Sequence, residues 1–158
     1  SGGTFQVDGN WNLPTTNNWN GGILKSLGII TNSGTLTLSG SSSKYLNTQL
    51  NNTGTIVEND SLFYFYDGAI LNNSGNYELQ KGEIRNYNGV GTFNNSGTFK
   101  KTTTGTGTIG VAFNNTGPVN VESGTLNISG GGVSNGGNFN LTTVDFCSRT
   151  ESIYSTKS

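Results

Sequence analysis

Apolar residues recur along this chain at nearly fixed intervals, and the residues between them are mostly Asn, Gly, Ser and Thr. A seven-residue block carries the pattern: apolar, small polar, Asn, Ser/Thr/Gly, Gly, any residue, apolar. It occurs at residues 30–36, 50–56, 71–77, 93–99, 113–119 and 133–139. The Asn in the third position, called here the marker Asn, is Asn32, Asn52, Asn73, Asn95, Asn115 and Asn135. Successive markers are 20, 21, 22, 20 and 20 residues apart, a period typical of stacked repeats.

Within each period, apolar and polar residues alternate, which predicts short β-strands with one face inward. The fourth position after the marker is always apolar: Leu36, Ile56, Tyr77, Phe99, Val119 and Phe139. The sixth is apolar except at Glu58 and Lys101. A further strand is expected at positions 11 and 13 after the marker, with inward pairs Phe63/Phe65, Ile84/Asn86, Thr106/Thr108 and Leu126/Ile128. The apolar residue two positions before each marker belongs to a third strand.

Three short strands in about 20 residues cannot bury their apolar faces alone, so successive turns are expected to stack. The sequence therefore predicts an all-β fold, a parallel β-solenoid of six to seven turns of 20 to 22 residues. We expect one domain, with the solenoid over residues 1–141 and a loop insertion at residues 8–28. The repeat stops after Leu141, and residues 142–158 are expected to cap the last turn or to contact another molecule. Their single cysteine, Cys147, is either a half-buried thiol or one partner of an interchain disulfide.

The marker asparagines are expected to point inward and to hydrogen-bond from turn to turn, because the residue two positions earlier also points inward. Such a ladder would prevent neighbouring turns from slipping in register. The Gly two positions after each marker is expected to take the corner with a positive φ. In the alternative interpretation, these Asn-Ser-Gly segments are exposed turns, selected only for their backbone conformation.

The run from Asn94 to Gly132 begins Asn-Asn-Ser-Gly-Thr-Phe-Lys-Lys-Thr and continues through Phe-Asn-Asn-Thr-Gly and Glu-Ser-Gly-Thr-Leu-Asn-Ile-Ser-Gly. These repeats resemble those of large bacterial secreted and surface β-helix proteins of the adhesin-like type, over most of residues 30–141. The resemblance implies a right-handed parallel β-helix and an extracellular or cell-surface setting. It implies no catalytic or binding residue, since the motif belongs to the scaffold.

Charge and composition narrow the set of partners. Charged residues make up 11% of the chain and the net charge is −1, so we expect neither nucleic acid nor an anionic membrane as a partner. No apolar run approaches the roughly 18 residues of a membrane span. The N-terminus does not resemble a secretory signal. If the protein is exported, we therefore expect that its signal has already been removed. Disordered chains share this polar composition, but they would not place apolar residues in fixed phase.

Residues suited to catalysis are scarce, and we expect no enzyme, no cofactor and no metal. The chain has no histidine, and its nine acidic residues are dispersed. The best cluster combines Glu58, Asp60 and Glu78 with three lysines, and it is better explained as a surface charge ladder in which Glu78 lies beneath Lys100. The Thr-x-Thr column that an ice-binding face would need is interrupted, and no calcium-binding nonapeptide occurs.

Recognition is the remaining chemistry. Exposed aromatic residues stack on sugars or anchor protein contacts, and the candidates are Trp11 and Trp19 in the expected loop, with Tyr64 and Tyr66 facing outward near Arg85. Asn-x-Ser/Thr sequons make Asn51, Asn72, Asn94 and Asn114 candidate glycosylation sites, although the repeat motif itself produces them. We expect an extracellular structural protein that self-associates into a fibre or surface layer through its uncapped ends. The alternative is a glycan- or surface-binding adhesin module, with a polysaccharide-active enzyme and an ice-binding protein ranked behind both.

Overall fold

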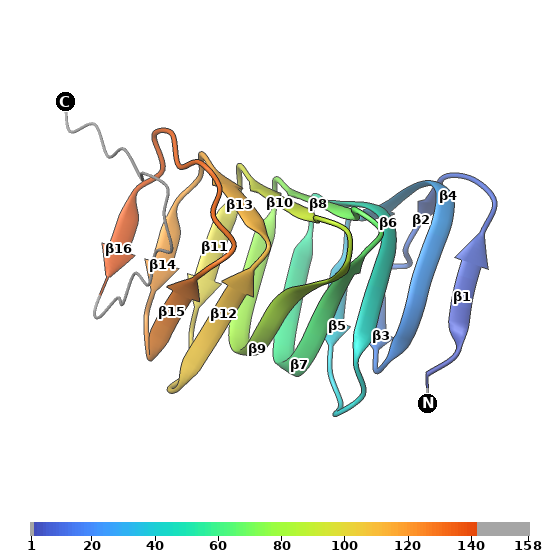
Figure 1. Ribbon diagram of the computed structural model, residues 1–158, viewed down its shortest axis with the longest axis horizontal. Coiled ribbons are helices and arrows are strands. Elements are labelled where there is room, and N and C mark those ends of the chain that lie inside the picture. The colour runs from blue at the N-terminus through green and yellow to red at the C-terminus, as the bar shows by residue number, and fades with distance from the viewer. Residues whose placement is uncertain (1, 142–158) are drawn as a thin grey trace.

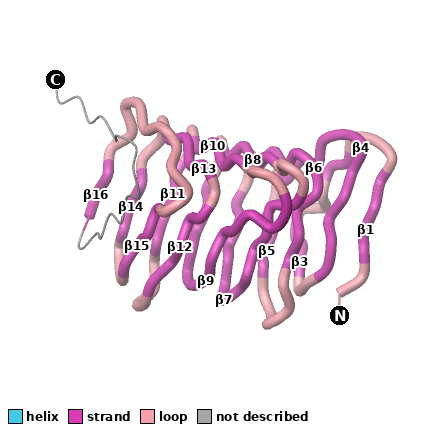
Figure 2. The backbone as a smooth tube through the Cα atoms, viewed as in Figure 1, coloured by secondary structure: helices cyan, strands magenta, loops and turns pink. Residues whose placement is uncertain are grey.

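The computed structural model describes residues 2–141, with all side chains in this range except those of Asp60 and Ser61. This part of the chain winds into a parallel β-solenoid of about seven turns, stacked along the long axis of the molecule (Figure 1). Within residues 2–141 the strands pair in parallel and no helix occurs (Figure 2). The predicted fold class is confirmed. The tail at 142–158, with Cys147, lies outside the described residues.

Each turn contributes strands to three faces. The marker face, which carries the marker asparagines, consists of β2 (Trp11–Asn12), the end of β4 (Gly22–Asn32), the end of β6 (Lys44–Asn52), β8 (Ile70–Asn73), β10 (Thr92–Asn95) and β13 (Ala112–Asn115). The second face consists of β3 (Thr16–Trp19), β5 (Thr35–Leu38), the starts of β7 (Thr55–Tyr66) and β9 (Asn76–Asn88), β11 (Thr98–Lys101), β14 (Val119–Val121) and β16 (Phe139–Leu141). The third face consists of β1 (Thr4–Val7), the starts of β4 and β6, the ends of β7 and β9, β12 (Thr106–Gly110) and β15 (Thr125–Ile128).

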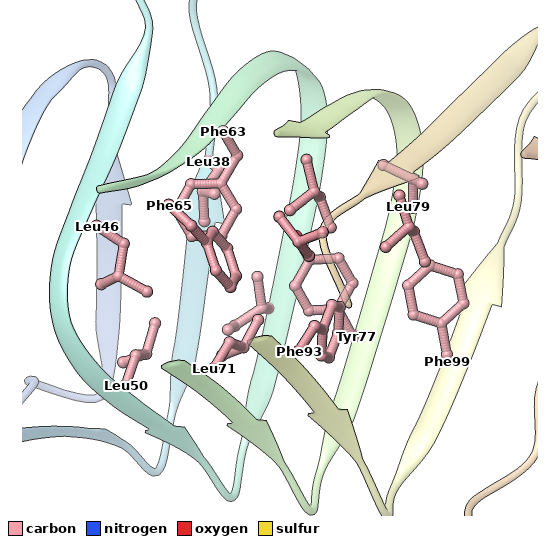
Figure 3. Packing of buried hydrophobic residues seen from close by; sticks show 14 of the residues in the cluster. Leu38, Leu46, Leu50, Phe63, Phe65, Leu71, Tyr77, Leu79, Phe93 and Phe99 are labelled. Carbon is pink, nitrogen blue, oxygen red and sulfur yellow. The ribbon is translucent and has the colours of Figure 1, made fainter. Parts of the chain in front are cut away.

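The strand register aligns equivalent positions of successive repeats. Ile30 pairs with Leu50, Leu50 with Leu71, and Leu71 with Phe93. The inward residues of the three faces fill the interior with one continuous apolar column, which includes Leu50, Leu71, Tyr77, Phe93 and Phe99 (Figure 3). Burial of such apolar surface supplies most of the driving force for folding.

Residues 8–28 form strands where the sequence predicted a loop. Trp11 pairs with Ile30 and Thr16 pairs with Thr35, so the segment completes a first turn and starts the second. The initial strand β1 pairs with the start of β4 on the third face, and not with the strand that follows a marker. At the marker position of this first turn, Leu13 and Thr15 stand in place of the Asn and the Gly, which is why sequence phasing did not recognise the turn.

Two predicted inward pairs are also incorrect. Gly107 and Ile109 are buried where Thr106 and Thr108 were expected, and Asn86 is exposed. Ile109 pairs with Ile84 although it lies three residues further from its own marker. In the earlier turn, β9 runs without a break from the second face to the third face. In the later turn, a corner of extra residues separates β11 from β12. Counting a fixed number of residues from the marker therefore fails on the third face.

The glycines that follow the markers are required by close approach of the stacked backbones. These residues have ordinary φ angles, so the expected positive φ is wrong. A Cβ on Gly75 would lie 2.1 Å from the carbonyl oxygen of Gly54, and one on Gly97 would lie 2.1 Å from that of Gly75. Real Cβ atoms do not approach an oxygen so closely, so a side chain here would push neighbouring turns apart.

Candidate functional surfaces

The marker asparagines form a buried ladder through the solenoid. The side-chain Nδ2 of each donates to the Oδ1 of the next, over 2.7 Å from Asn32 to Asn52, 2.6 Å to Asn73, 2.6 Å to Asn95 and 2.7 Å to Asn115. The five side chains are at most 1% exposed. Each Nδ2 also donates to the carbonyl oxygen of the Gly two residues on. The inward ladder is therefore confirmed over these five markers.

The ladder ends one turn from each end of the described solenoid. Asn135, the predicted sixth rung, is exposed, and Ser134 occupies the position paired with Asn115. At the other end, Asn12 pairs with Thr31. The residues that follow this pair are Leu13 and Asn32, so Leu13 occupies the position that faces Asn32. A leucine cannot donate, and the Asn32 Oδ1 atom is buried without a hydrogen-bond partner. Such an unsatisfied acceptor is costly, and it marks a defined terminus of the ladder.

A second ladder runs along the outside of the marker face. Nδ2 of Asn72 donates to Oδ1 of Asn51, Asn94 donates to Asn72, and Asn114 donates to Asn94, each over 2.9 Å. These donors point toward the N-terminus, opposite to the inner ladder. The same four residues are the candidate glycosylation sites. Because their amides interlock at a strand spacing of about 4.8 Å, glycans on all four at once would not fit.

Three charged side chains are buried with polar partners. Glu58 Oε2 accepts from the Tyr77 hydroxyl over 2.5 Å, and both residues are fully buried. Burial, the Glu58 charge and this hydrogen bond together raise the pKa of Tyr77 well above its ordinary value. Lys44 Nζ donates to the carbonyl oxygens of Gly40 and Ser42, over 2.8 and 2.9 Å.

Lys101 Nζ donates to carbonyl oxygens of Thr103 and Ser123, and burial lowers the pKa of this ammonium group. The role of Lys44 and Lys101 is to hold corner segments against the core.

The predicted surface charge ladder is only partly correct. The backbone register does set Glu78 beside Lys100. The Lys100 ammonium, however, pairs with Glu122 on the following turn over 3.4 Å, while Glu78 accepts from Gln80 and Thr102. Glu58 is buried, and the side chain of Asp60 lies outside the described part. Among the described residues no group of three His, Cys, Asp or Glu side chains could hold a metal ion.

The four predicted recognition residues lie in two separate places. Trp19 packs edge-to-face on Phe63, with ring centroids 5.6 Å apart, and therefore belongs largely to the core. Trp11 is 43% exposed and stacks edge-on with Phe5 over 6.1 Å at the N-terminal end. A hollow of about 540 Å³ is lined by Phe5, Trp11, Trp19 and Leu24.

Tyr64 and Tyr66 lie on the third face, where they join Tyr45 and Tyr87 in a cluster that sequence reasoning missed. Tyr45 and Tyr64 stack at 5.1 Å and 13°, and Tyr66 and Tyr87 stack at 5.3 Å and 19°. Tyr87 also meets Tyr45 and Tyr64 edge-on, at 5.2 and 5.7 Å. We call these four residues the tyrosine platform. Tyr45 precedes Tyr64 by one turn in the strand register, so a column alignment of the third face would have found the first pair.

Between residues 2 and 141 no helix is long and apolar enough to cross a bilayer. Comparison of the sequence with protein-family models, with curated proteins and with solved structures found no match of any of the three kinds. The likeness of the repeats to adhesin-like proteins therefore stays an expectation.

Proposed function

We propose that this chain is an extracellular structural β-solenoid that associates head to tail with further copies of itself into a fibre or surface layer. The observation that supports this most is the unpaired edge that the described part of the solenoid presents at β1, β2 and β3. Within the described residues, β1 and β2 pair only with β4, and β3 pairs only with β5. All three faces thus end in a strand with one unpaired edge, and an unpaired edge is a template for another strand.

Apolar side chains at this end support the same contact. Phe5 and Trp11 are 48% and 43% exposed, and both line the 540 Å³ hollow that opens at the end of the core. In the interior of the solenoid, the equivalent of Trp11 is the fully buried Ile30, which has a paired turn on each side, with Trp11 on one and Leu50 on the other. A further turn stacked on β1, β2 and β3 would bury these rings in the same way.

The charge distribution fits pairing of one end with the other. Residues 2–21 contain one charged residue, Asp8, and residues 123–141 contain none. Natural edge strands are usually protected by charged residues such as lysine, which oppose pairing with another chain. A contact of one end with the opposite end is heterologous, and such contacts produce open filaments when the rotation does not close. The tail at 142–158 lies outside the described residues and carries Asp145, Arg149, Glu151 and Lys157; it is proposed to take part in the same contact.

The test is the mass of the 16.6 kDa chain as a function of concentration, by light scattering coupled to gel filtration, with electron micrographs of the same samples. We expect the mass to rise with concentration and filaments to form. Trp11→Lys places a charge at the open end and should give a monomer. Val90→Lys, at a 74% exposed apolar residue far from both ends, is the matched control and should assemble normally. A monomer at every concentration, or equal loss in both variants, would contradict the proposal.

A further inference from the structure

The tyrosine platform is an exposed aromatic surface on the side of the solenoid, away from the end proposed for assembly. Its members come from three successive turns: Tyr45 in β6, Tyr64 and Tyr66 in β7, and Tyr87 in β9. Tyr87 is 59% exposed and the other three are half-buried. A contiguous aromatic patch on a protein surface marks a site of interaction more often than scattered apolar residues do.

A β-bulge directs the fourth ring into the platform. Phe65 pairs with Asn86 and Tyr66 with Asn88, so Tyr87 is the additional residue in β9. Without the bulge, the register would pair Tyr87 directly with Tyr66. With it, the Tyr87 ring contacts the rings of Tyr45, Tyr64 and Tyr66 together. Bulges often re-aim a side chain next to a functional site.

The ring contacts make the platform rigid before any ligand arrives. Each ring packs against at least one other, with ring centroids 5.1 to 5.7 Å apart, and the Tyr87 ring packs against all three others. Tyrosine side chains also lose little conformational entropy on binding, since they have only two torsions. Among the described residues, the four hydroxyl groups form no hydrogen bond with another protein group, and none of them is buried, so they are open to a ligand.

Paired polar side chains border the rings. Arg85 lies beside Tyr64 in the register and forms an ion pair with Glu83. At the other border, Nδ2 of Asn88 donates to Oδ1 of Asp67 over 2.7 Å, and Asp67 is the one described non-glycine residue with a positive φ, 54°. Gly68 also has a positive φ, 76°, and the Ala69 N–H donates to the Tyr66 carbonyl oxygen over 3.2 Å, so this conformation of Asp67 is that of an ordinary Asp-Gly turn.

We propose that the tyrosine platform binds a neutral polysaccharide chain. Sugar rings present an apolar C–H face that packs on aromatic rings, and hydroxyl groups that exchange hydrogen bonds with tyrosine hydroxyls, amides and carboxylates at a rim. The Arg85 guanidinium at the border of the platform is already paired with Glu83. The surface therefore offers no excess positive charge to an acidic polysaccharide. This binding function goes beyond the proposed role in assembly and uses a different surface.

The same charges argue against nucleic acid, which requires a positively charged groove beside its stacking rings. A proline-rich peptide also packs on aromatic rings. It offers few hydroxyl groups, however, to the four open tyrosine hydroxyls and the Asp67–Asn88 pair. The sugar chain uses both the rings and the polar rim, and is the ligand that the platform fits better.

Isothermal titration calorimetry tests the proposal with soluble probes: cellohexaose, laminarihexaose and mannohexaose as neutral chains, hexaguluronate as an acidic chain, and decaproline as a peptide. We expect at least one neutral hexasaccharide to bind. Tyr87→Ala should weaken that binding by about tenfold, since about 1.4 kcal/mol of stacking corresponds to that factor. Tyr87→Phe retains the ring and should lose less. Trp11→Ala removes an exposed ring at the open end and should leave the affinity unchanged.

Thermal unfolding of each variant shows whether it is folded, which the exposure of Tyr87 leads us to expect. The proposal is overturned if none of the three neutral hexasaccharides binds, if only hexaguluronate or only decaproline binds, or if Tyr87→Ala and Trp11→Ala weaken sugar binding equally. Light scattering on the same samples reports assembly separately, so an unsubstituted chain that assembles normally but binds none of the neutral hexasaccharides contradicts this proposal alone.

Discussion

Removal of a central rung of the inner ladder should be among the most costly polar substitutions in this chain. Asn73 is 1% exposed, accepts from Asn52 over 2.6 Å and donates to Asn95 over 2.6 Å. In Asn73→Ala the Oδ1 atom of Asn95 stays buried and loses its donor, which costs about 1–3 kcal/mol. Asn52 loses its nearest acceptor but keeps the carbonyl oxygen of Asn76 at 2.9 Å, a loss of about 0.5–1.5 kcal/mol. Together the two losses cost about 1.5–4.5 kcal/mol.

Asn94→Ala is the matched control. Asn94 also has an asparagine partner on each side, at 2.9 Å, but it belongs to the outer ladder and is only half-buried. Water replaces its lost partners, so the expected cost is about 0.5 kcal/mol. The assay is urea unfolding, monitored by circular dichroism. The slope of the unfolding free energy against urea concentration is compared between variants, because a changed slope would mean that a different number of turns unfolds together. Equal losses in the two variants would refute the distinction between buried and exposed ladders.

Other substitutions test separate features of the same stack. Leu13→Asn supplies a donor to the unsatisfied Oδ1 of Asn32 and should stabilise the fold by about 1 kcal/mol in urea unfolding; a loss of stability would show that the ladder cannot extend into the first turn. Gly75→Ala should lower the free energy of unfolding by more than about 3 kcal/mol or prevent folding, because the new Cβ would lie 2.1 Å from a carbonyl oxygen. In Gly3→Ala the new Cβ has open space around it, so this control should leave the melting temperature unchanged. The raised pKa of Tyr77 means that the folded state keeps this proton more tightly than the unfolded state. The stability it contributes is present below pH about 10 and is lost as pH rises further, so Tyr77→Phe should flatten the alkaline part of a stability–pH profile, and parallel profiles would contradict the assignment.

The period of the marker asparagines was sufficient to predict the fold, because in a solenoid the same column position recurs in every turn. Asn52, Asn73 and Asn95 lie in one file, and the alternation around them placed the neighbouring apolar residues inward. The same alternation placed Glu58 and Lys101 in an otherwise apolar column, but Glu58 was assigned to a surface charge ladder and is in fact buried. Their hydrogen bonds to Tyr77 and Thr103 were not predicted, since the first depends on side-chain reach to the next turn and the second on the path of the corner that follows Lys101.

The errors arose where the chain departs from a fixed count. The first turn lacks a marker, the corner before β12 is longer, and the last described turn places Ser134 opposite Asn115. The tyrosine platform was half found for a related reason. Alternation placed Tyr64 and Tyr66 outward, but a bulge brings Tyr87 to them, and no local sequence signal marks a bulge in a parallel pair.

The most direct test of the account is the proximity of marker side chains in solution. In isotope-labelled protein, nuclear Overhauser contacts should connect the side-chain amide protons of Asn52 to those of Asn73, and those of Asn73 to those of Asn95. The same amides should exchange slowly with water, as their burial requires. Amides that exchange as fast as free asparagine, with no contact between successive markers, would contradict the stacked solenoid and everything inferred from it.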